Sequence, residues 1–246
     1  MLDVSLEPVR RTLLRDEAYR LIRDAIVAGT LAPGEVVRDA DLAARLGLSR
    51  APVRDALARL IDDGLVESKP QSYTRVTRVD LREARDAVAV VRAMHELAVR
   101  AAVPILDARD IRAMRAANVR FAAAVRRGDV ELALSADDAL HDVLVAVCAN
   151  RAATATIERF TPLIRRLERS TFATLSGQRS VRLHEELIEA CAAADVERAV
   201  AVNAAIWSAL LDVLAEDREP SGAAPVTQSS RSPAAPVLDP PPAGGC

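Results

Sequence analysis

Two short helical patterns, separated by a tight turn, lie between residues 39 and 63. The first pattern, Asp39 to Leu46, is closed by Gly47, and glycine commonly follows the last turn of a helix. Ser49 is a good N-cap for the second pattern, Arg50 to Asp63, which Gly64 ends. Helices of these lengths, joined by so short a turn, have the proportions of a helix-turn-helix.

The flanking segments predict one more helix and a β-hairpin. Apolar residues at helical spacing run from Asp16 to Ala28, and Gly29 ends that helix. Leu65 to Glu67 and Thr74 to Thr77 alternate as two short strands around a polar turn. This hairpin is the only strong strand signal in the chain, and after the paired helices it would form a wing.

From Asp80 onward the pattern changes to long helices with few glycines. We expect helices at about 80–103, 108–127, 129–148, 151–172, 179–193 and 195–216. The predicted fold is therefore mostly α, with an N-terminal winged helix-turn-helix at 10–79 and an all-α helical bundle at 80–217. Residues 218–246 are rich in Pro, Ala, Ser and Gly, and we predict a disordered tail there.

Composition limits the compartment and the kind of partner. Of the 246 residues, 50% are apolar and only 2% aromatic, which favours packed helices over sheets. The net charge of −2 means that any contact with nucleic acid must come from a local basic face. Cys148, Cys191 and Cys246 are scattered and form no disulfide framework. No run reaches transmembrane length, so we expect a soluble cytoplasmic protein that makes no membrane contact.

The second short helix carries the candidate DNA contacts. Arg50 and Arg54 are four residues apart and share a face beside Ser49, whereas Val53, Leu57, Leu60 and Ile61 would pack inward. A helix that enters the major groove with its N-terminus first would direct these arginines at guanine edges and phosphates. On the hairpin, Lys69, Arg75 and Arg78 could reach the backbone or the minor groove. The alternative is an exposed arginine-bearing helix in an ordinary helical protein.

The run from Leu42 to Leu60, followed by Asp63-Gly64-Leu65-Val66, resembles the N-terminal domain of GntR-family regulators, as does the stretch Ile26 to Gly34. The resemblance covers about residues 15–78. It implies that Arg50 and Arg54 read operator DNA, with Ser49 and Ala51 at the same helix start and Arg38 as a further phosphate contact. The family's wing usually has a glycine at its tip, where this chain has Pro70-Gln71-Ser72-Tyr73.

Asp137 and His141 lie four residues apart on one helix face that is otherwise apolar. An acid and an imidazole in an apolar stripe need each other or a metal, and their spacing leaves both possibilities open. The segment Asp137 to Leu144 resembles the Asp-x-x-x-His segment of the FCD effector domain, and His184 to Ile188 matches another part of that domain.

The FCD resemblance implies a divalent metal held by one aspartate and three histidines, with a small carboxylate completing the shell. Asp137, His141 and His184 match three of these ligands, and Ile206 stands where the fourth is expected. Three protein ligands plus water or effector could still hold Zn²⁺ or a similar ion.

A second resemblance to the FCD domain concerns its first helix. Arg92 and Glu96 match an Arg-x-x-x-Glu pattern, and the fork of Arg92 suits an effector carboxylate. A structural ion pair is the alternative for Arg92. His95 stands where such domains usually have an apolar residue, and we expect it in the core. Arg165 and Arg166 could face either the cavity or solvent.

These expectations converge on a ligand-responsive transcriptional regulator, a homodimeric repressor that binds an inverted-repeat operator. Its effector would be a small molecule, expected to be a carboxylate. One alternative is a metal-dependent enzyme of small organic acids that uses Asp137, His141 and His184, although no general base or nucleophile stands beside them. Another is a regulator whose helical domain is purely structural, which Ile206 favours.

Overall fold

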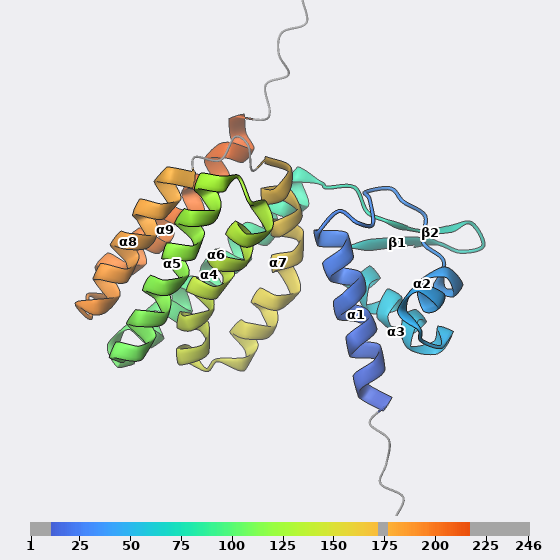
Figure 1. The fold of residues 1–246 in the computed structure, drawn as a ribbon, viewed down its shortest axis with the longest axis horizontal. Helices are drawn as coiled ribbons and strands as arrows, with labels where there is room; N and C mark the ends of the chain where they lie inside the picture. Colours follow the sequence, from blue (N-terminus) through green and yellow to red (C-terminus); the bar gives the residue numbers. More distant parts are fainter. Residues whose placement is uncertain (1–10, 172–176, 217–246) are drawn as a thin grey trace, which may run out of the picture.

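The computed structural model describes residues 11–171 and 177–216, so the predicted tail at 218–246 lies outside the described residues. Within these ranges the chain folds as two side-by-side groups of helices, with one hairpin in the smaller group (Figure 1). The smaller group contains α1 (Arg11–Val27), α2 (Asp39–Leu46), α3 (Arg50–Asp62), β1 (Val66–Lys69) and β2 (Tyr73–Val76). The larger group contains α4 (Leu81–Ala102), the 3₁₀ turn η1 (Val103–Ile105), α5 (Ala108–Arg127), α6 (Val130–Cys148), α7 (Arg151–Thr171), α8 (Gly177–Ala192) and α9 (Val196–Glu216). The prediction of a mostly α chain with a winged helix-turn-helix and a helical bundle is confirmed.

The smaller group is built around the inner faces of its three helices. Val53, Leu57 and Leu60 of α3 are buried in one apolar core with residues from α1, α2 and the hairpin, as the helical spacing predicts. The expectation for Ile61 was wrong, because it is 38% exposed, and Ala56 takes the inward position instead. Gly47 ends α2 with φ +66°, a conformation in which a side chain would be strained.

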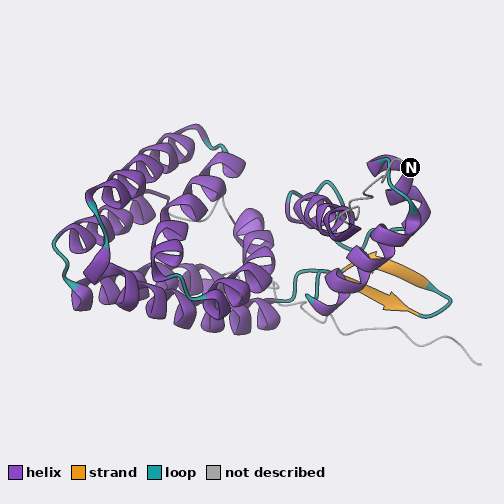
Figure 2. Ribbon diagram, turned by 90° about the horizontal axis from the view of Figure 1, so that it is seen from below, coloured by secondary structure: helices purple, strands orange, loops and turns teal. Residues whose placement is uncertain are grey.

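The hairpin is antiparallel, with Val66 opposite Val76 and Lys69 opposite Tyr73. The loop before α2 adds a bridge from Val36 to Arg75 at the free edge of β2. At the tip, where the sequence lacks the usual glycine, Gln71 adopts φ +58°. The left-handed region costs a residue with a side chain about 1–2 kcal/mol, so the wing stores local strain. Figure 2 shows the hairpin in orange, on the half that lies away from the helical bundle.

The larger group is a bundle in which α4 packs against α6, α7 and α9, while α5 packs against α6 and α8. Aspartates begin four of its helices, because the side chains of Asp80, Asp107, Asp129 and Asp195 accept hydrogen bonds from free backbone N–H groups of the first turns. The predicted boundaries differ from the observed ones by a few residues, as expected where helix ends fray. No helix in the described ranges combines the length and the apolar character needed to cross a bilayer.

Helix α7 packs beside α1 and contacts both groups. Arg159 donates to the backbone oxygen of Asp62 at 2.7 Å and lies 3.4 Å from the carboxylate of Asp63, at the end of α3. One turn later Leu163 packs against the core of the smaller group. Next, the buried Arg166 donates to the hydroxyl of Thr77 at 2.9 Å and to its backbone oxygen. These residues, at helical spacing, form one face of α7, which is directed at the smaller group.

Candidate functional site

The start of α3 presents its polar residues to solvent. Arg50 is 65% exposed and makes hydrogen bonds of 3.0 Å with the carboxylate of Asp39, at the start of α2. Arg54 is exposed, and its guanidinium makes no hydrogen bond or ion pair with any other described residue. Ser49 occupies the N-cap, but its side chain makes no capping hydrogen bond. With the exposed Ala51, these residues form a surface that can approach DNA.

The other predicted DNA contacts lie on neighbouring elements. Arg38 is 76% exposed at the N-cap of α2. Arg75 lies on β2, pairs with Glu67 and stacks over the ring of Tyr73, with 4.3 Å from its guanidinium carbon to the ring centroid. Because Arg75 has both an acid and an aromatic partner, its head group is already oriented on the wing. Lys69 and Arg78 are both exposed.

A cavity of about 1050 Å³ lies between the helices of the larger group and α1. Each long helix of the bundle contributes to its wall, and the residues used below are His95, Phe121, Asp137, His141, Arg165, His184, Ile206 and Trp207. The smaller group also contributes, because Arg23, Asp24 and Val27 of α1 line the same cavity. The helix that packs on α3 therefore forms part of the cavity wall together with the bundle.

Asp137, His141 and His184 come together at this cavity, one ligand atom from each lying within 4.8 Å of the others. From Asp137 Oδ1 the distance is 3.3 Å to His184 Nε2 and 3.9 Å to His141 Nε2. Donors that each lie about 2.1 Å from one ion are at most about 4.2 Å apart, so these two pairs already fit a shared ion. The two imidazoles are buried and the carboxylate nearly so.

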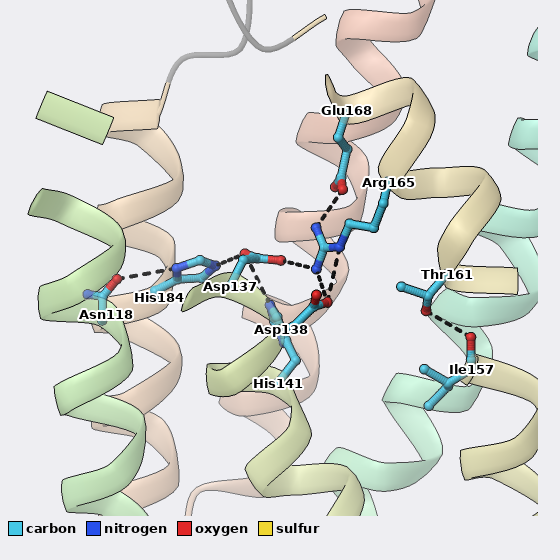
Figure 3. A network of polar contacts seen from close by, with 9 residues as sticks. All are labelled: Asn118, Asp137, Asp138, His141, Ile157, Thr161, Arg165, Glu168 and His184. Atoms are coloured by element: carbon cyan, nitrogen blue, oxygen red, sulfur yellow. Dashed lines mark hydrogen bonds and ion pairs between the residues drawn. The ribbon is translucent and has the colours of Figure 1, made fainter. Parts of the chain in front are cut away.

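Neighbouring residues orient two of the three donors, Asp137 and His184, as Figure 3 shows. His184 Nδ1 lies 3.3 Å from the amide oxygen of Asn118. If Nδ1 carries the proton and donates it there, Nε2 keeps a lone pair that faces Asp137. Arg165 donates to the other oxygen of Asp137 at 2.7 Å. The oxygen of Asp137 and the nitrogen of His184 that face the centre are thus left for a ligand. His184 Nε2 is accordingly buried without a hydrogen-bond partner among the described residues.

The charges around this centre favour a cation. Burial lowers the pKa of His141 to about 3, so its imidazole is neutral and can coordinate. Burial opposes ionisation of Asp137, but the charge of the Arg165 guanidinium favours it, and the pKa of the carboxyl lies well below its usual range. Burial raises the pKa of Glu168 to about 7, partly offset by Arg165. Arg165 is the one cation bonded to Asp137, Asp138 and Glu168 in the described structure, so acidic charge is in excess.

The donor set suits a divalent metal ion. One carboxylate oxygen and two imidazole nitrogens are ligands that Zn²⁺ and similar ions accept. The cluster has a negative charge for the ion to balance, and Asp137 and His184 are each oriented by a second partner. Ile206 also lines the cavity, so its position offers a hydrocarbon surface and no ligand atom.

The structure shows which of the arginines face the cavity, a question that the sequence left open. Arg165 lines the cavity, and Arg166 reaches Thr77 in the smaller group. Arg92 is half-buried on α4 and is not among the residues that line the cavity. His95, expected in the core, is 5% exposed, and its ring faces the cavity beside His141.

Two partners of the centre were not anticipated from the sequence, Asn118 and Glu168. Asn118 has a detectable signal, because it stands at helical spacing with the buried Met114, Ala117 and Phe121 on α5. An amide within an apolar stripe needs a buried partner. Glu168 has no comparable signal, since an acid three residues after Arg165 is ordinary on an exposed helix.

Comparison with known proteins assigns both groups of elements. Residues 14–76 match the family described as "Bacterial regulatory proteins, gntR family", and residues 86–209 match the FCD domain. An HTH-type transcriptional regulator from the TAR-I ttuE-ttuC' intergenic region of Agrobacterium vitis is 32% identical over 54% of this chain and 79% of its own length. The HTH-type transcriptional repressor RspR of Escherichia coli (strain K12) is 24% identical over 76% of this chain and 84% of its own.

A solved structure shows the same fold. Escherichia coli McbR/YncC superposes with a TM-score of 0.75 at 20% identity, covering 84% of this chain and 99% of that one. The relatives from Agrobacterium vitis and Escherichia coli (strain K12) described above are named as a regulator and a repressor of transcription, in agreement with the exposed arginines of α3. The chain is a ligand-responsive DNA-binding regulator that belongs to the GntR family and carries an FCD domain.

Proposed function

We propose that this regulator is a metal-dependent repressor that binds an inverted-repeat operator as a homodimer and responds to a small carboxylate. The observation that carries the proposal is the centre formed by Asp137, His141 and His184 inside a cavity that also touches α1. A purely structural bundle would have no reason to leave a buried imidazole nitrogen unpaired there.

Arg50 and Arg54 are the proposed base-reading residues, with Ser49, Ala51, Arg38 and Arg75 as flanking contacts. Their exposure supports this assignment, because nothing in the described structure covers the start of α3. A dimer would present two such helices, and operator symmetry would then mirror protein symmetry. We place the boundary between the DNA-binding domain and the effector domain at residues 79–80, and we propose that the protein acts in the cytoplasm.

Asp137, His141 and His184 would hold the metal ion. A bound divalent ion would supply positive charge and open coordination positions to which a carboxylate can bind. Arg165 keeps the second oxygen of Asp137 engaged, and Asn118 fixes the ring of His184. Arg92 does not line the cavity. It would contact the effector only if the ligand extends beyond the residues that do.

Helix α7 is the proposed connection between ligand and DNA. One of its faces carries Arg165 and Glu168 at the cavity. Another carries Arg159 and Arg166, which hold the end of α3 and Thr77. A shift of α7 on ligand binding would therefore change the orientation of the DNA-binding domain. A differential affinity of a few kcal/mol between the two arrangements is enough to switch operator occupancy.

The test combines metal content with DNA affinity. Duplexes selected from a random pool by the purified protein serve as the operator, and zinc content is measured by mass spectrometry after dialysis. We expect about one zinc ion per chain and a duplex affinity that changes when zinc and small carboxylates are added. Asp137→Asn should lose the zinc. Asp142→Asn, on the same helix and the same cavity wall but outside the centre, is the matched control and should keep it.

Two results would contradict the proposal. One is zinc content that is equal in Asp137→Asn and the wild type, since the centre would then not be the metal site. The other is zinc-loaded protein whose DNA affinity is indifferent to every carboxylate tested.

A further inference from the structure

Buried polar atoms without a hydrogen bond are concentrated near the candidate metal centre. Among the described residues they include ring nitrogens of His95, His141, His184 and Trp207 and both amide atoms of Asn203. Native structures leave few such atoms, because each costs more than a formed hydrogen bond returns. A metal ion held by Asp137 Oδ1 and the two Nε2 atoms accounts for His184 Nε2. It does not account for His141 Nδ1 or for the other three side chains.

Two of these three side chains, His95 on α4 and Trp207 on α9, lie side by side. The ring of His95 is centred 5.3 Å from that of Trp207 and 5.4 Å from that of His141. Both His95 and Trp207 line the cavity. Asn203 lies one helical turn before Trp207 on the same face of α9 and is 1% exposed. Asn203 is not among the residues that line the cavity, so we give the name neutral subsite to His95 and Trp207.

The chemistry of this subsite is uncharged. The indole of Trp207 can only donate a hydrogen bond, whereas a neutral imidazole such as that of His95 has one donor and one acceptor nitrogen. Arg165, the cation bonded to Asp137, already pairs with Asp138 and Glu168. A second carboxylate on a ligand would find no free positive charge in this subsite. A hydroxyl group, which both donates and accepts, matches it.

We propose that the neutral subsite binds hydroxyl groups of the effector, so that the effector is a hydroxylated carboxylic acid. This inference rests on the proposed function, because the metal centre is assigned the carboxylate end of the ligand. The hydroxyl-bearing carbons then lie between the centre and α9. The unpartnered nitrogens are shielded from solvent, so small rotations of the two rings accompany binding.

The test compares acids of equal length by isothermal calorimetry on the zinc-loaded full chain. The three-carbon probes are glycerate, propionate and malonate, and the four-carbon probes are 2,3,4-trihydroxybutanoate, butyrate and succinate. Within each chain length, the first acid carries hydroxyl groups, the second carries only hydrogens at those carbons, and the third carries a second carboxylate. We expect the hydroxylated acid of at least one length to bind about tenfold or more tighter than its unsubstituted partner, the gain from one satisfied buried group.

Trp207→Phe and His95→Phe keep an aromatic ring and remove the nitrogens. We expect each to reduce the preference for the hydroxylated acid several-fold while zinc content stays at the wild-type value. Ile206→Val changes the same wall without touching a polar atom and should keep the preference.

The inference is overturned if unsubstituted acids bind as tightly as hydroxylated ones, if dicarboxylates bind tightest, if the preference survives both aromatic substitutions, or if zinc-loaded protein binds none of the probes. If the wild-type protein binds no zinc, the result rejects the proposed function itself and not only the inference about hydroxyl groups.

Discussion

Replacing Arg54 with alanine tests the DNA-reading surface with little risk to the fold. The side chain is exposed on α3, and its guanidinium has no partner among the described residues. Alanine is also the best helix former, so the helix itself should not suffer. The free energy of unfolding should therefore change by less than about 0.5 kcal/mol, as for an ordinary surface substitution.

The expected loss in DNA affinity is much larger. An arginine that reads a guanine contributes about 1–3 kcal/mol per base pair. The proposed dimer uses the residue twice, so the total is about 2–6 kcal/mol, or roughly 30-fold to more than 10,000-fold in affinity. Replacing Arg50 with alanine should reduce DNA affinity somewhat less, because Arg50 gives up its exposed ion pair with Asp39 when it binds DNA. Such exposed pairs contribute about 0–1 kcal/mol.

Fluorescence anisotropy at several salt concentrations measures the effect, with the selected duplex and a scrambled duplex of equal length. Arg112→Ala is the control, since it removes one exposed positive charge from α5, in the other group of helices. It should leave the ratio of the two affinities unchanged. If Arg54→Ala keeps the wild-type ratio, or if Arg112→Ala lowers it equally, the assignment of α3 as the reading helix is refuted.

Three further predictions concern coupling, pH and local strain. Arg166→Met should keep the zinc content but reduce the ligand-induced change in DNA affinity, because the contact with Thr77 is lost; an undiminished change would contradict the role of α7. Glu168 has a pKa raised to about 7, so the stability tied to its protonated form is fully present below its ordinary pKa of 4.5 and is lost as pH rises through 7. Relative to Glu168→Gln, the wild type should therefore lose up to about 3 kcal/mol between pH 4.5 and 8 in urea titrations, and parallel pH profiles would rule this out. Gln71→Gly should raise the free energy of unfolding by about 0.5–1 kcal/mol, because glycine adopts φ +58° without strain, and a lower melting temperature would show that the tip is not strained.

The local features of this chain could be predicted from its sequence. The paired helices at Asp39 and Arg50 follow from apolar spacing and from Gly47, because these signals act within a few residues along the chain. The spacing of Asp137 and His141 likewise places both on one face of α6, whatever surrounds that helix.

Only the tertiary structure decided which helix faces, distant along the sequence, pack against each other. His184 joins Asp137 because α8 packs against α5 within the bundle, and the period of a helix does not fix the neighbour that its face meets. For the same reason Arg165 lines the cavity whereas Arg92 does not, although both lie on amphipathic helices. The rotation of a helix in a bundle is set by side-chain packing along its whole length, which no local segment of sequence contains.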